Sequence, residues 1–325
     1  MKKNILVIHT GGTISMSEDR ETGAVQPTDK NPMASAPAEQ LQQSATLLVE
    51  EPFTLPSPHI TPKEMLQIRD MIKDKMKQTT IDGVVITHGT DTLEETAYFL
   101  DLLLDTQIPV VLTGAMRSSN EIGFDGLHNF ITSIRVASSN QAQGKGVLVV
   151  LNDEIHTAKN VTKTHTSNVS TFQSPQFGPI GIVTKQEVLF HHQPITTRKF
   201  NVQNITKNVP LLKAHAGMDS TLLLALSDIQ IDGLVIEALG QGNLPPSTLP
   251  GLHALITQDV PIVLVSRCFN GITQDVYSYE GGGKQLKKLG LIFSNGLNGQ
   301  KARLKLLAAL EEGKTREEIN TIFHT

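Results

Sequence analysis

The sequence predicts an α/β protein with a larger N-terminal domain, built on a doubly wound and mostly parallel sheet, and a smaller C-terminal α/β domain. Three observations support this fold class. Short apolar runs alternate with helical patterns, which is typical of layered α/β domains. The runs are continuously apolar, as strands covered on both faces usually are. The 325 residues are enough for two domains, and the alternation is interrupted once and then resumes.

Four apolar runs in the N-terminal half are expected to be buried strands, at residues 5–8, 83–86, 109–112 and 147–151. Helices are expected to start at Thr61-Pro62 and to cover residues 92–104 and 125–137. Thr61 is a favourable N-cap, and proline is favoured in a first helical turn. Apolar residues then recur on one face of this first helix. They are Met65, Ile68, Ile72 and Met76.

The alternation breaks up at residues 186–208, where paired histidines, a proline and scattered charges occur. We therefore predict an N-terminal domain at residues 1–185, a linker at 186–208 and a C-terminal domain at 209–325. The C-terminal domain should contain strands at residues 209–214, 233–238 and 261–266, and helices near 218–227, 246–257 and 299–312. The stretch 17–38 has no apolar period, and a loop of this length is usually functional or disordered.

Charge and composition exclude several classes of protein. The net charge is −4, with mixed signs and no Lys/Arg block, so no nucleic-acid surface is expected. No apolar stretch approaches the roughly 20 residues of a membrane span, and the run at 5–8 is too short for a signal peptide. Cys268 is the single cysteine and cannot form an internal disulfide. We expect a soluble, cytoplasmic protein that binds neither nucleic acid nor membranes.

A polar, glycine-containing loop follows the first expected strand, with the sequence Thr10-Gly-Gly-Thr13-Ile-Ser15. In open α/β sheets, ligands bind outside the carboxyl ends of strands, and glycines let the backbone approach a small ligand closely. On its own, the loop is more simply a tight turn whose hydroxyls cap a helix. It has neither the Gly-Lys-Ser/Thr spacing of a phosphate loop nor the three glycines of a dinucleotide loop.

A second polar loop, Thr87-His-Gly-Thr90-Asp91-Thr92, follows the strand that ends at Ile86. A helix cap at Asp91 or Thr92 would explain one polar residue and not five. Two strand ends that both present hydroxyls favour one shared site over two unrelated turns. An isolated lysine such as Lys163 is usually a solvated charge. It would matter only if the fold placed its amine beside Thr90, where it could take a hydroxyl proton.

Residues 7–15 and 83–93 together resemble the two diagnostic segments of the bacterial-type L-asparaginase family. Further similar segments extend over nearly the whole chain, at residues 94–99, 112–117, 161–164, 240–243 and 300–303. The resemblance implies hydrolysis of the side-chain amide of L-asparagine to L-aspartate and ammonia, with no metal or other cofactor. It also implies homotetramers built as dimers of dimers, with each active site at a dimer interface.

The resemblance assigns the reacting groups. Thr13 is similar to the threonine nucleophile that forms an acyl-enzyme. Thr90, Asp91 and Lys163 resemble the second hydroxyl set, in which Lys163 polarises Thr90 and Asp91 holds the substrate α-ammonium.

Further residues are expected to bind substrate on the same resemblance. Ser57 aligns with a residue that holds the α-carboxylate, and Asn243 resembles a contact donated by the neighbouring subunit. Gly12, Gly89 and Ala115 are expected to line the substrate, with backbone N–H groups near Thr90 and Ala115 stabilising the oxyanion. The histidines near these segments (His9, His88 and His165) are not at metal-ligand spacing and are expected to be structural.

Two departures from the family pattern matter. The family usually has a tyrosine in the loop after the first motif, whereas the tyrosines here are Tyr98, Tyr277 and Tyr279. The exported high-affinity subgroup carries a glutamate shortly after Thr-Gln-Asp, where this chain has Val-Tyr-Ser-Tyr. Our hypothesis is that Tyr277 or Tyr279 of a partner subunit supplies the missing phenol. The alternative is that water or Thr90 takes that role.

Three other functions compete with this interpretation. A broad glutaminase-asparaginase would share the same motifs. The amidase subunit of tRNA-dependent amidotransferases normally carries an extra N-terminal domain, whereas here the first motif begins at the first strand. A catalytically silent amino-acid sensor of the same fold should lack a catalytic hydroxyl or the lysine, and Thr13, Thr90 and Lys163 are all present.

Overall fold

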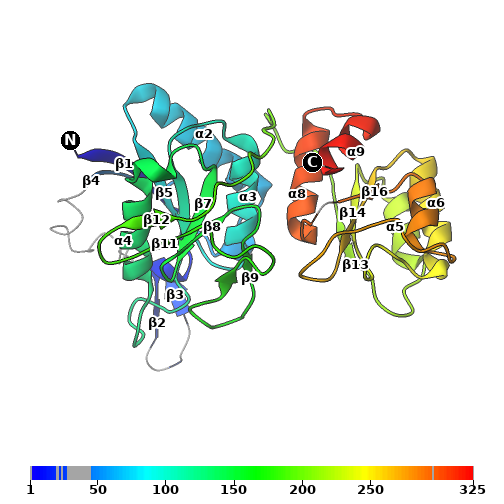
Figure 1. The fold of residues 1–325 in the computed structure, drawn as a ribbon, viewed down its shortest axis with the longest axis horizontal. Coiled ribbons are helices and arrows are strands. Elements are labelled where there is room, and N and C mark those ends of the chain that lie inside the picture. Colours follow the sequence, from blue (N-terminus) through cyan, green and yellow to red (C-terminus); the bar gives the residue numbers. More distant parts are fainter. Residues whose placement is uncertain (1, 20–21, 23–24, 28–44, 295, 325) are drawn as a thin grey trace. The chain divides into compact units, whose positions relative to one another are not determined.

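A computed structural model describes residues 2–19, 22, 25–27, 45–294 and 296–324 (Figure 1). The chain forms two compact units, Met1–Lys199 and Phe200–Thr325, and each is described by itself. Both units combine helices with a sheet, and the first unit has the larger sheet, so the predicted fold class is confirmed. Among the residues that the structure describes, no helix is long and apolar enough to cross a membrane.

The first unit contains an eight-stranded sheet of order β12-β11-β8-β7-β6-β5-β1-β4. The strands are β1 Lys3–His9, β4 Ala45–Glu50, β5 Gly83–Thr87, β6 Val110–Thr113, β7 Val147–Leu151, β8 Glu154–Thr157, β11 Gly181–Val183 and β12 Val188–Phe190. Strands β4, β1, β5, β6 and β7 run parallel, and the other three continue the sheet antiparallel. The sheet is therefore mostly parallel, as predicted.

Both faces of this sheet are covered by helices. These are α2 Pro62–Gln78, α3 Leu93–Leu103 and α4 Gly126–Ala137. Successive residues of β1 point to opposite faces, so Ile5 packs with α4 in one apolar cluster and Leu6 packs with α2 and α3 in another. Burial on both faces explains why these strands are continuously apolar in sequence.

Helix α2 begins as its sequence predicts. Thr61 and Glu64 form a reciprocal capping box, and Pro62 occupies the first position. Met65, Ile68 and Ile72 are buried on one face. Met76, in the last turn of this helix, is 37% exposed.

Short strands appear where the sequence predicted loops. Strands β2 Met16–Glu18 and β3 Val25–Pro27 pair antiparallel inside the stretch 17–38, whose positions 20, 21, 23, 24 and 28–38 lie outside the described residues. Strand β12 lies within the predicted linker, where three apolar residues extend the sheet by pairing with β11. Strands β9 Thr162–Lys163 and β10 Phe172–Gln173 form a separate two-stranded sheet.

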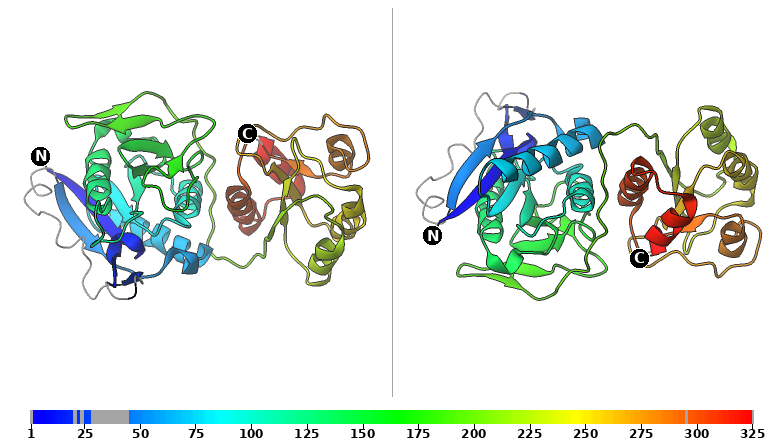
Figure 2. Two further views of the ribbon diagram at one scale, coloured as in Figure 1. Left: turned by 90° about the horizontal axis from the view of Figure 1, so that it is seen from below. Right: turned by 90° about the horizontal axis from the view of Figure 1, so that it is seen from above.

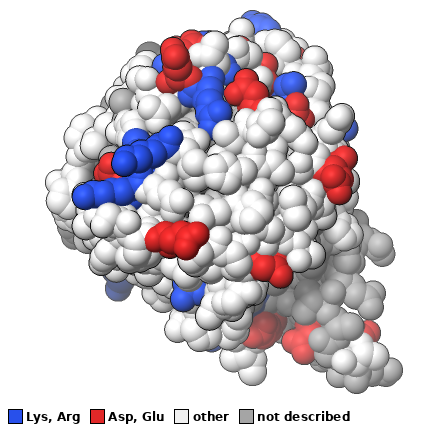
Figure 3. Space-filling model, turned by 90° about the vertical axis from the view of Figure 1, so that its right-hand side faces the viewer, with Lys and Arg blue, Asp and Glu red and all other residues white. Residues whose placement is uncertain are grey.

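The second unit has a four-stranded parallel sheet of order β13-β14-β15-β16. Its strands are β13 Leu211–Lys213, β14 Leu234–Ala238, β15 Ile262–Ser266 and β16 Ile292–Phe293. Its helices are α5 Thr221–Asp228, α6 Leu249–Thr257, α7 Gly283–Lys288, α8 Gly299–Glu311 and α9 Arg316–His324. Helices α5 and α6 pack on one face of the sheet and α8 on the other (Figure 2). On the face of this unit in Figure 3, both signs of charge lie among uncharged side chains.

Candidate active site

The two polar loops lie side by side because their strands are neighbours. Strands β1 and β5 run parallel, and their last residues, His9 and Thr87, are paired. The backbone N–H and the Oγ1 of Thr10 both donate to the carbonyl oxygen of Thr87, at 3.1 and 2.9 Å. The loops thus leave the same edge of the sheet together, at the carboxyl ends of the strands where α/β proteins bind ligands.

Gly12 brings the first loop against the second, and Gly11 brings it against Leu55. Gly11 and Gly12 have φ angles of 101° and 85°, in the left-handed region that favours glycine. A Cβ on Gly12 would stand 2.3 Å from the Cα and N of Gly89, and one on Gly11 would stand 2.6 Å from the carbonyl oxygen of Leu55. The backbones therefore touch, and Thr13 starts a short 3₁₀ turn, Thr13–Ser15, directly after this contact.

Lys163 joins the second loop through its amine. Its Nζ donates to the Oγ1 of Thr90 at 2.9 Å and to the Oδ1 of Asp91 at 2.7 Å. The lysine side chain is only 16% exposed, so it is not a solvated surface charge. Thr90 is buried, whereas the Asp91 side chain is 61% exposed and open to a ligand. Lys163 thus forms one cluster with Thr90 and Asp91, although it lies 73 and 72 positions after them in the chain.

Ser57 borders this cluster from a third segment. It lies in a 3₁₀ turn, Ser57–His59, and is buried. Its Oγ accepts a hydrogen bond from the Asp91 N–H at 3.2 Å, and its carbonyl oxygen accepts one from the Thr92 hydroxyl at 2.8 Å. A Cβ on Gly89 would stand 2.8 Å from the Ser57 Oγ. The predicted carboxylate-binding residue is therefore in contact with the second loop.

The end of β6 closes the site beside Thr90. A Cβ on Gly114 would stand 2.6 Å from the carbonyl oxygen of His88 and 3.2 Å from the Cγ2 of Thr90. Ala115, the next residue, is fully buried. Gly12, Ser57, Gly89 and Ala115 therefore belong to the same neighbourhood as the catalytic candidates.

Two residues that sequence reasoning missed hold the loop after β6. The Asp125 carboxylate accepts hydrogen bonds from the backbone N–H groups of Met116 and Arg117, at 3.1 and 3.0 Å. The Asn129 side-chain amide donates to the carbonyl oxygen of Gly114 at 3.0 Å. Their helix, α4, was predicted, but periodicity describes its apolar face and gives no signal for polar contacts with a loop.

His88 and His9 are structural in this fold. Burial lowers the pKa of His88 to about 4, so its ring is neutral near pH 7. Its Nδ1 lies 2.7 Å from the carbonyl oxygen of Gly89, which can only accept, so Nδ1 carries the proton and Nε2 accepts from the Thr96 hydroxyl at 2.8 Å. Burial also lowers the pKa of His9, whose Nδ1 lies 2.7 Å from the Thr87 Oγ1. Both rings therefore stabilise the loops by hydrogen bonds.

The remaining predicted site residues lie in the second unit. Asn243 is buried, and its Oδ1 accepts from the Gly283 N–H at 3.1 Å, so this side chain holds a neighbouring loop. Tyr277 and Tyr279 are 43% and 55% exposed, and their ring centroids lie 5.5 Å apart. Their phenols are accessible to a partner molecule, and the substrate roles of all three residues stay predictions.

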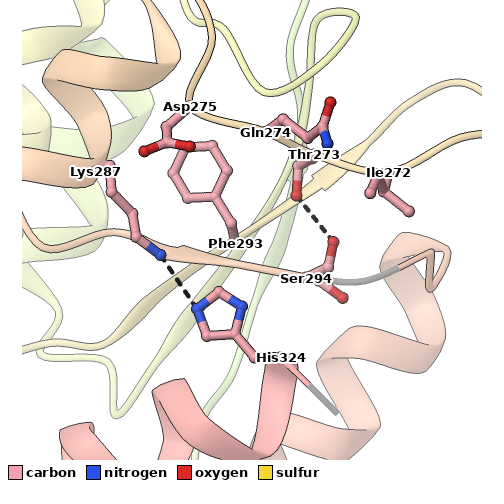
Figure 4. A pocket seen from close by; sticks show the side chains of 8 residues that line it. All are labelled: Ile272, Thr273, Gln274, Asp275, Lys287, Phe293, Ser294 and His324. Atoms are coloured by element: carbon pink, nitrogen blue, oxygen red, sulfur yellow. Dashed lines mark hydrogen bonds between the residues drawn. The ribbon is translucent and has the colours of Figure 1, made fainter.

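The second unit also contains a hollow of about 260 Å³ (Figure 4). Lys287 and His324 face each other in it, with Nζ and Nε2 3.2 Å apart, and the Thr273 hydroxyl donates to the Ser294 carbonyl oxygen at 2.9 Å. Burial, followed by the Lys287 charge, lowers the pKa of His324. None of the predicted catalytic residues lines this hollow, because all of them belong to the first unit.

Comparison with known proteins decides the family. The asparaginase N-terminal domain matches residues 4–196, and the glutaminase/asparaginase C-terminal domain matches residues 208–323. The chain belongs to the asparaginase family. The family predicted from the two loops is therefore confirmed.

Relatives within the family cover nearly the whole chain. A probable L-asparaginase of Deinococcus radiodurans is 40% identical over 98% of this chain and 96% of its own length. A glutaminase-asparaginase of Pseudomonas aeruginosa is 30% identical over 98% of this chain and 90% of its own. The crystal structure of a probable cytoplasmic L-asparaginase from Campylobacter jejuni matches with a TM-score of 0.88 and 32% identity, covering 100% of both chains.

Proposed function

We propose that this chain is an L-asparaginase that hydrolyses the side-chain amide of L-asparagine to L-aspartate and ammonia. One observation carries the proposal: a single lysine amine contacts the Thr90 hydroxyl and the Asp91 carboxylate, beside the Gly12–Gly89 backbone contact that leads into Thr13. Family membership and relatives named L-asparaginase support this substrate.

In the first step, the Thr13 oxygen attacks the side-chain carbonyl carbon of asparagine and the Thr13 hydroxyl loses its proton. The C–N bond breaks, and the departing NH2 group takes up that proton and leaves as ammonia, so an ester joins Thr13 to the aspartyl group. The Thr90 Oγ1 accepts a hydrogen bond from Lys163, so the hydroxyl proton of Thr90 does not point at the lysine and is available to the reacting groups. Thr90 can therefore exchange protons with the reacting groups while Lys163 stabilises charge on its oxygen.

In the second step, water attacks the ester carbonyl and gives its proton to the Thr13 oxygen, which releases aspartate and restores the enzyme. Thr90, polarised by Lys163, directs this water. Oxyanion stabilisation in both steps comes from backbone N–H groups near Thr90 and Ala115. The buried position of Ala115 supports this assignment, since donors in a water-excluded site interact more strongly with developing charge.

The substrate backbone is held by the rim of the site. The exposed carboxylate of Asp91 binds the α-ammonium, and the Ser57 hydroxyl donates to the α-carboxylate. The Ser57 Oγ already accepts from the Asp91 N–H, so its own proton is available for donation. Gly12 and Gly89 keep the floor of the site free of side chains.

Self-association and a cytoplasmic location are proposed from the family resemblance. The chain assembles as a homotetramer, and Asn243 with Tyr277 or Tyr279 of a partner subunit completes each site. Exposed Leu222, Leu224 and Ile229 on and beside helix α5 are the kind of apolar surface that self-association buries. The chain is cytoplasmic, as the Campylobacter jejuni relative is described to be.

A broad glutaminase-asparaginase is the second candidate, because relatives with that name are about as similar as several L-asparaginases. Ammonia release from L-asparagine and L-glutamine separates the two. We expect kcat/KM for asparagine to exceed that for glutamine by about tenfold or more, since one methylene in a tight pocket gives discrimination of that size. Equal values favour the broad enzyme. No release from either amide, by folded protein, indicates a silent sensor and contradicts the proposal.

Thr13→Ala and Thr90→Ala test the two hydroxyls in the same assay. Each should lower kcat by about 10³-fold or more while leaving the circular dichroism spectrum unchanged, because groups that act as a unit cannot replace one another. A fully active Thr90→Ala protein removes the second hydroxyl from the mechanism.

A further inference from the structure

The strand that carries Lys163 is too short to fix a side chain by sheet pairing alone. Strand β9 has two residues, and it pairs with the two residues of β10, Thr162 with Gln173 and Lys163 with Phe172. A catalytic group must be held within about 0.5 Å of its productive position. Further contacts must therefore fix the backbone from which Lys163 reaches Thr90.

A buried carboxylate supplies such contacts. The Oε1 of Glu94 accepts hydrogen bonds from the Thr162 hydroxyl at 2.9 Å and from the backbone N–H of Lys163 at 3.1 Å. Glu94 is 5% exposed and lies in the first turn of helix α3. The helix N-terminus favours a negative charge there, and hydrogen bonds to an ionised acceptor are about twice as strong as neutral ones.

The second polar loop and Glu94 belong to one continuous segment. Thr90 and Asp91 immediately precede helix α3, whose first turn contains Glu94. This one segment therefore contacts Lys163 at two points. Thr90 and Asp91 accept hydrogen bonds from its amine, and Glu94 accepts one from its backbone N–H. Movement of β9 relative to this segment would lengthen all of these contacts together.

We propose that Glu94 is a positioning residue for Lys163, an inference that rests on the proposed function. Its hydrogen bonds to Thr162 and to the Lys163 backbone let it act through Lys163. It fixes the backbone of Thr162 and Lys163, so that the lysine amine stays within hydrogen-bond distance of Thr90. Loss of these contacts should impair the chemical step more than substrate binding, because the Asp91 carboxylate and Ser57 remain in place.

Kinetics of substituted full-length chains test this inference. Glu94→Ala should lower kcat by about 10- to 100-fold, the effect of misplacing a reacting group by about 1 Å, with KM close to the unsubstituted value. Glu94→Gln keeps an acceptor oxygen and should recover most of the activity. Thr162→Val removes the hydroxyl that donates to Glu94 and leaves the side-chain volume nearly constant. It should lower kcat roughly 3- to 10-fold, which corresponds to the free energy of one hydrogen bond.

A matched control variant shows whether loss of a negative charge at the start of helix α3 by itself lowers kcat. Glu95→Gln deletes the same negative charge from the first turn of α3, but the next residue in a helix points about 100° away. It should leave kcat unchanged. If Glu95→Gln loses as much activity as Glu94→Ala, the negative charge at the start of the helix, and not the contact with β9, accounts for the loss, and the inference is overturned. If Glu94→Ala does not fold, Thr162→Val decides the inference in its place, and an unchanged kcat of that variant overturns it.

A double substitution separates this inference from the proposed function. In a Lys163→Met background, Glu94→Ala should cost no further activity at high enzyme concentration, because its target is already gone. An equal further loss means that Glu94 acts elsewhere and overturns the inference. Full activity of Lys163→Met itself would instead contradict the proposed function. An inactive Lys163→Met together with a fully active Glu94→Ala would overturn only the role of Glu94.

Discussion

The contact between Gly12 and Gly89 is the single-residue feature on which the site depends most directly. Gly12→Ala combines an unfavourable backbone angle with a Cβ that would stand 2.3 Å from the Gly89 backbone. We expect a loss of about 2–5 kcal/mol in unfolding free energy, from left-handed strain and overpacking, together with a large loss of kcat. Urea denaturation and ammonia release measure the two effects.

Gly178→Ala is the matched control for this substitution. Gly178 has a φ of 71°, and nothing lies within 4 Å of its would-be Cβ. It should lose only about 1–2 kcal/mol from backbone strain and keep its activity. If Gly12→Ala behaves like Gly178→Ala, the two loops are not in contact as described.

His88 gives a prediction about pH. The unfolded ring, with a pKa near 6.5, binds a proton between that pH and about 4, whereas the folded ring does not. The unfolded chain thus binds more protons in this window, and stability falls as the pH drops through it, by about 3 kcal/mol in total. At about pH 5.5, NMR of the ring nitrogens should show the His88 ring in its neutral form, as the tautomer with the hydrogen on Nδ1, whereas exposed histidines are mostly charged at that pH. A His88 titration near pH 6.5 would contradict its burial.

The sequence identified the residues of the site that carry distinctive chemistry. Thr13, Thr90, Asp91 and Lys163 were predicted from two hydroxyl-rich loops and a family resemblance. Glu94 was missed as a functional residue, because acidic residues in a first helical turn are common and its hydrogen bonds to β9 depend on tertiary structure. Asp125 and Asn129 were missed because their hydrogen bonds to the loop after β6 also depend on tertiary structure.

At the scale of elements, the cap of helix α2 should stabilise the first unit without tuning the site. Thr61→Ala removes the hydroxyl from the capping box and should lower the unfolding free energy by about 1 kcal/mol. KM for asparagine should stay unchanged, because Ser57 is held separately by the Asp91 N–H and the Thr92 hydroxyl. A clear rise in KM would show that the cap also positions Ser57.

Apolar runs predicted the long parallel strands and failed for the short ones. Strands β1, β5, β6 and β7 are buried on both faces, so their burial is recorded in sequence as unbroken Val, Ile and Leu. Strands β9 and β10 have two residues each and carry no period. Helix α9 was missed despite a usable signal: Thr315 and Glu318 have capping-box spacing and exchange hydrogen bonds. The predicted boundaries of the domains and linker stay predictions.

At the scale of the whole molecule, the proposed shared active site requires more than one chain. If a partner's phenol completes each site, Tyr277→Phe or Tyr279→Phe should lower kcat by about 10²- to 10⁴-fold, the usual contribution of a positioned proton-transfer group. Analytical ultracentrifugation should show a tetramer for the unsubstituted chain and both variants. Full turnover of both variants would mean that water or Thr90 takes the phenol's role. A fully active monomer would contradict shared active sites altogether.

The central claim is that four distant segments of the first unit, which carry Thr13, Ser57, Thr90 with Asp91, and Lys163, meet around one small amino acid. A crystal structure with L-aspartate bound tests it most directly. We expect the α-ammonium to contact Asp91 and the α-carboxylate to contact Ser57. The side-chain carboxylate should lie between the hydroxyls of Thr13 and Thr90, with the Lys163 amine hydrogen-bonded to Thr90. Aspartate bound elsewhere, or a Thr13 oxygen out of reach of its side-chain carboxylate, would contradict the account.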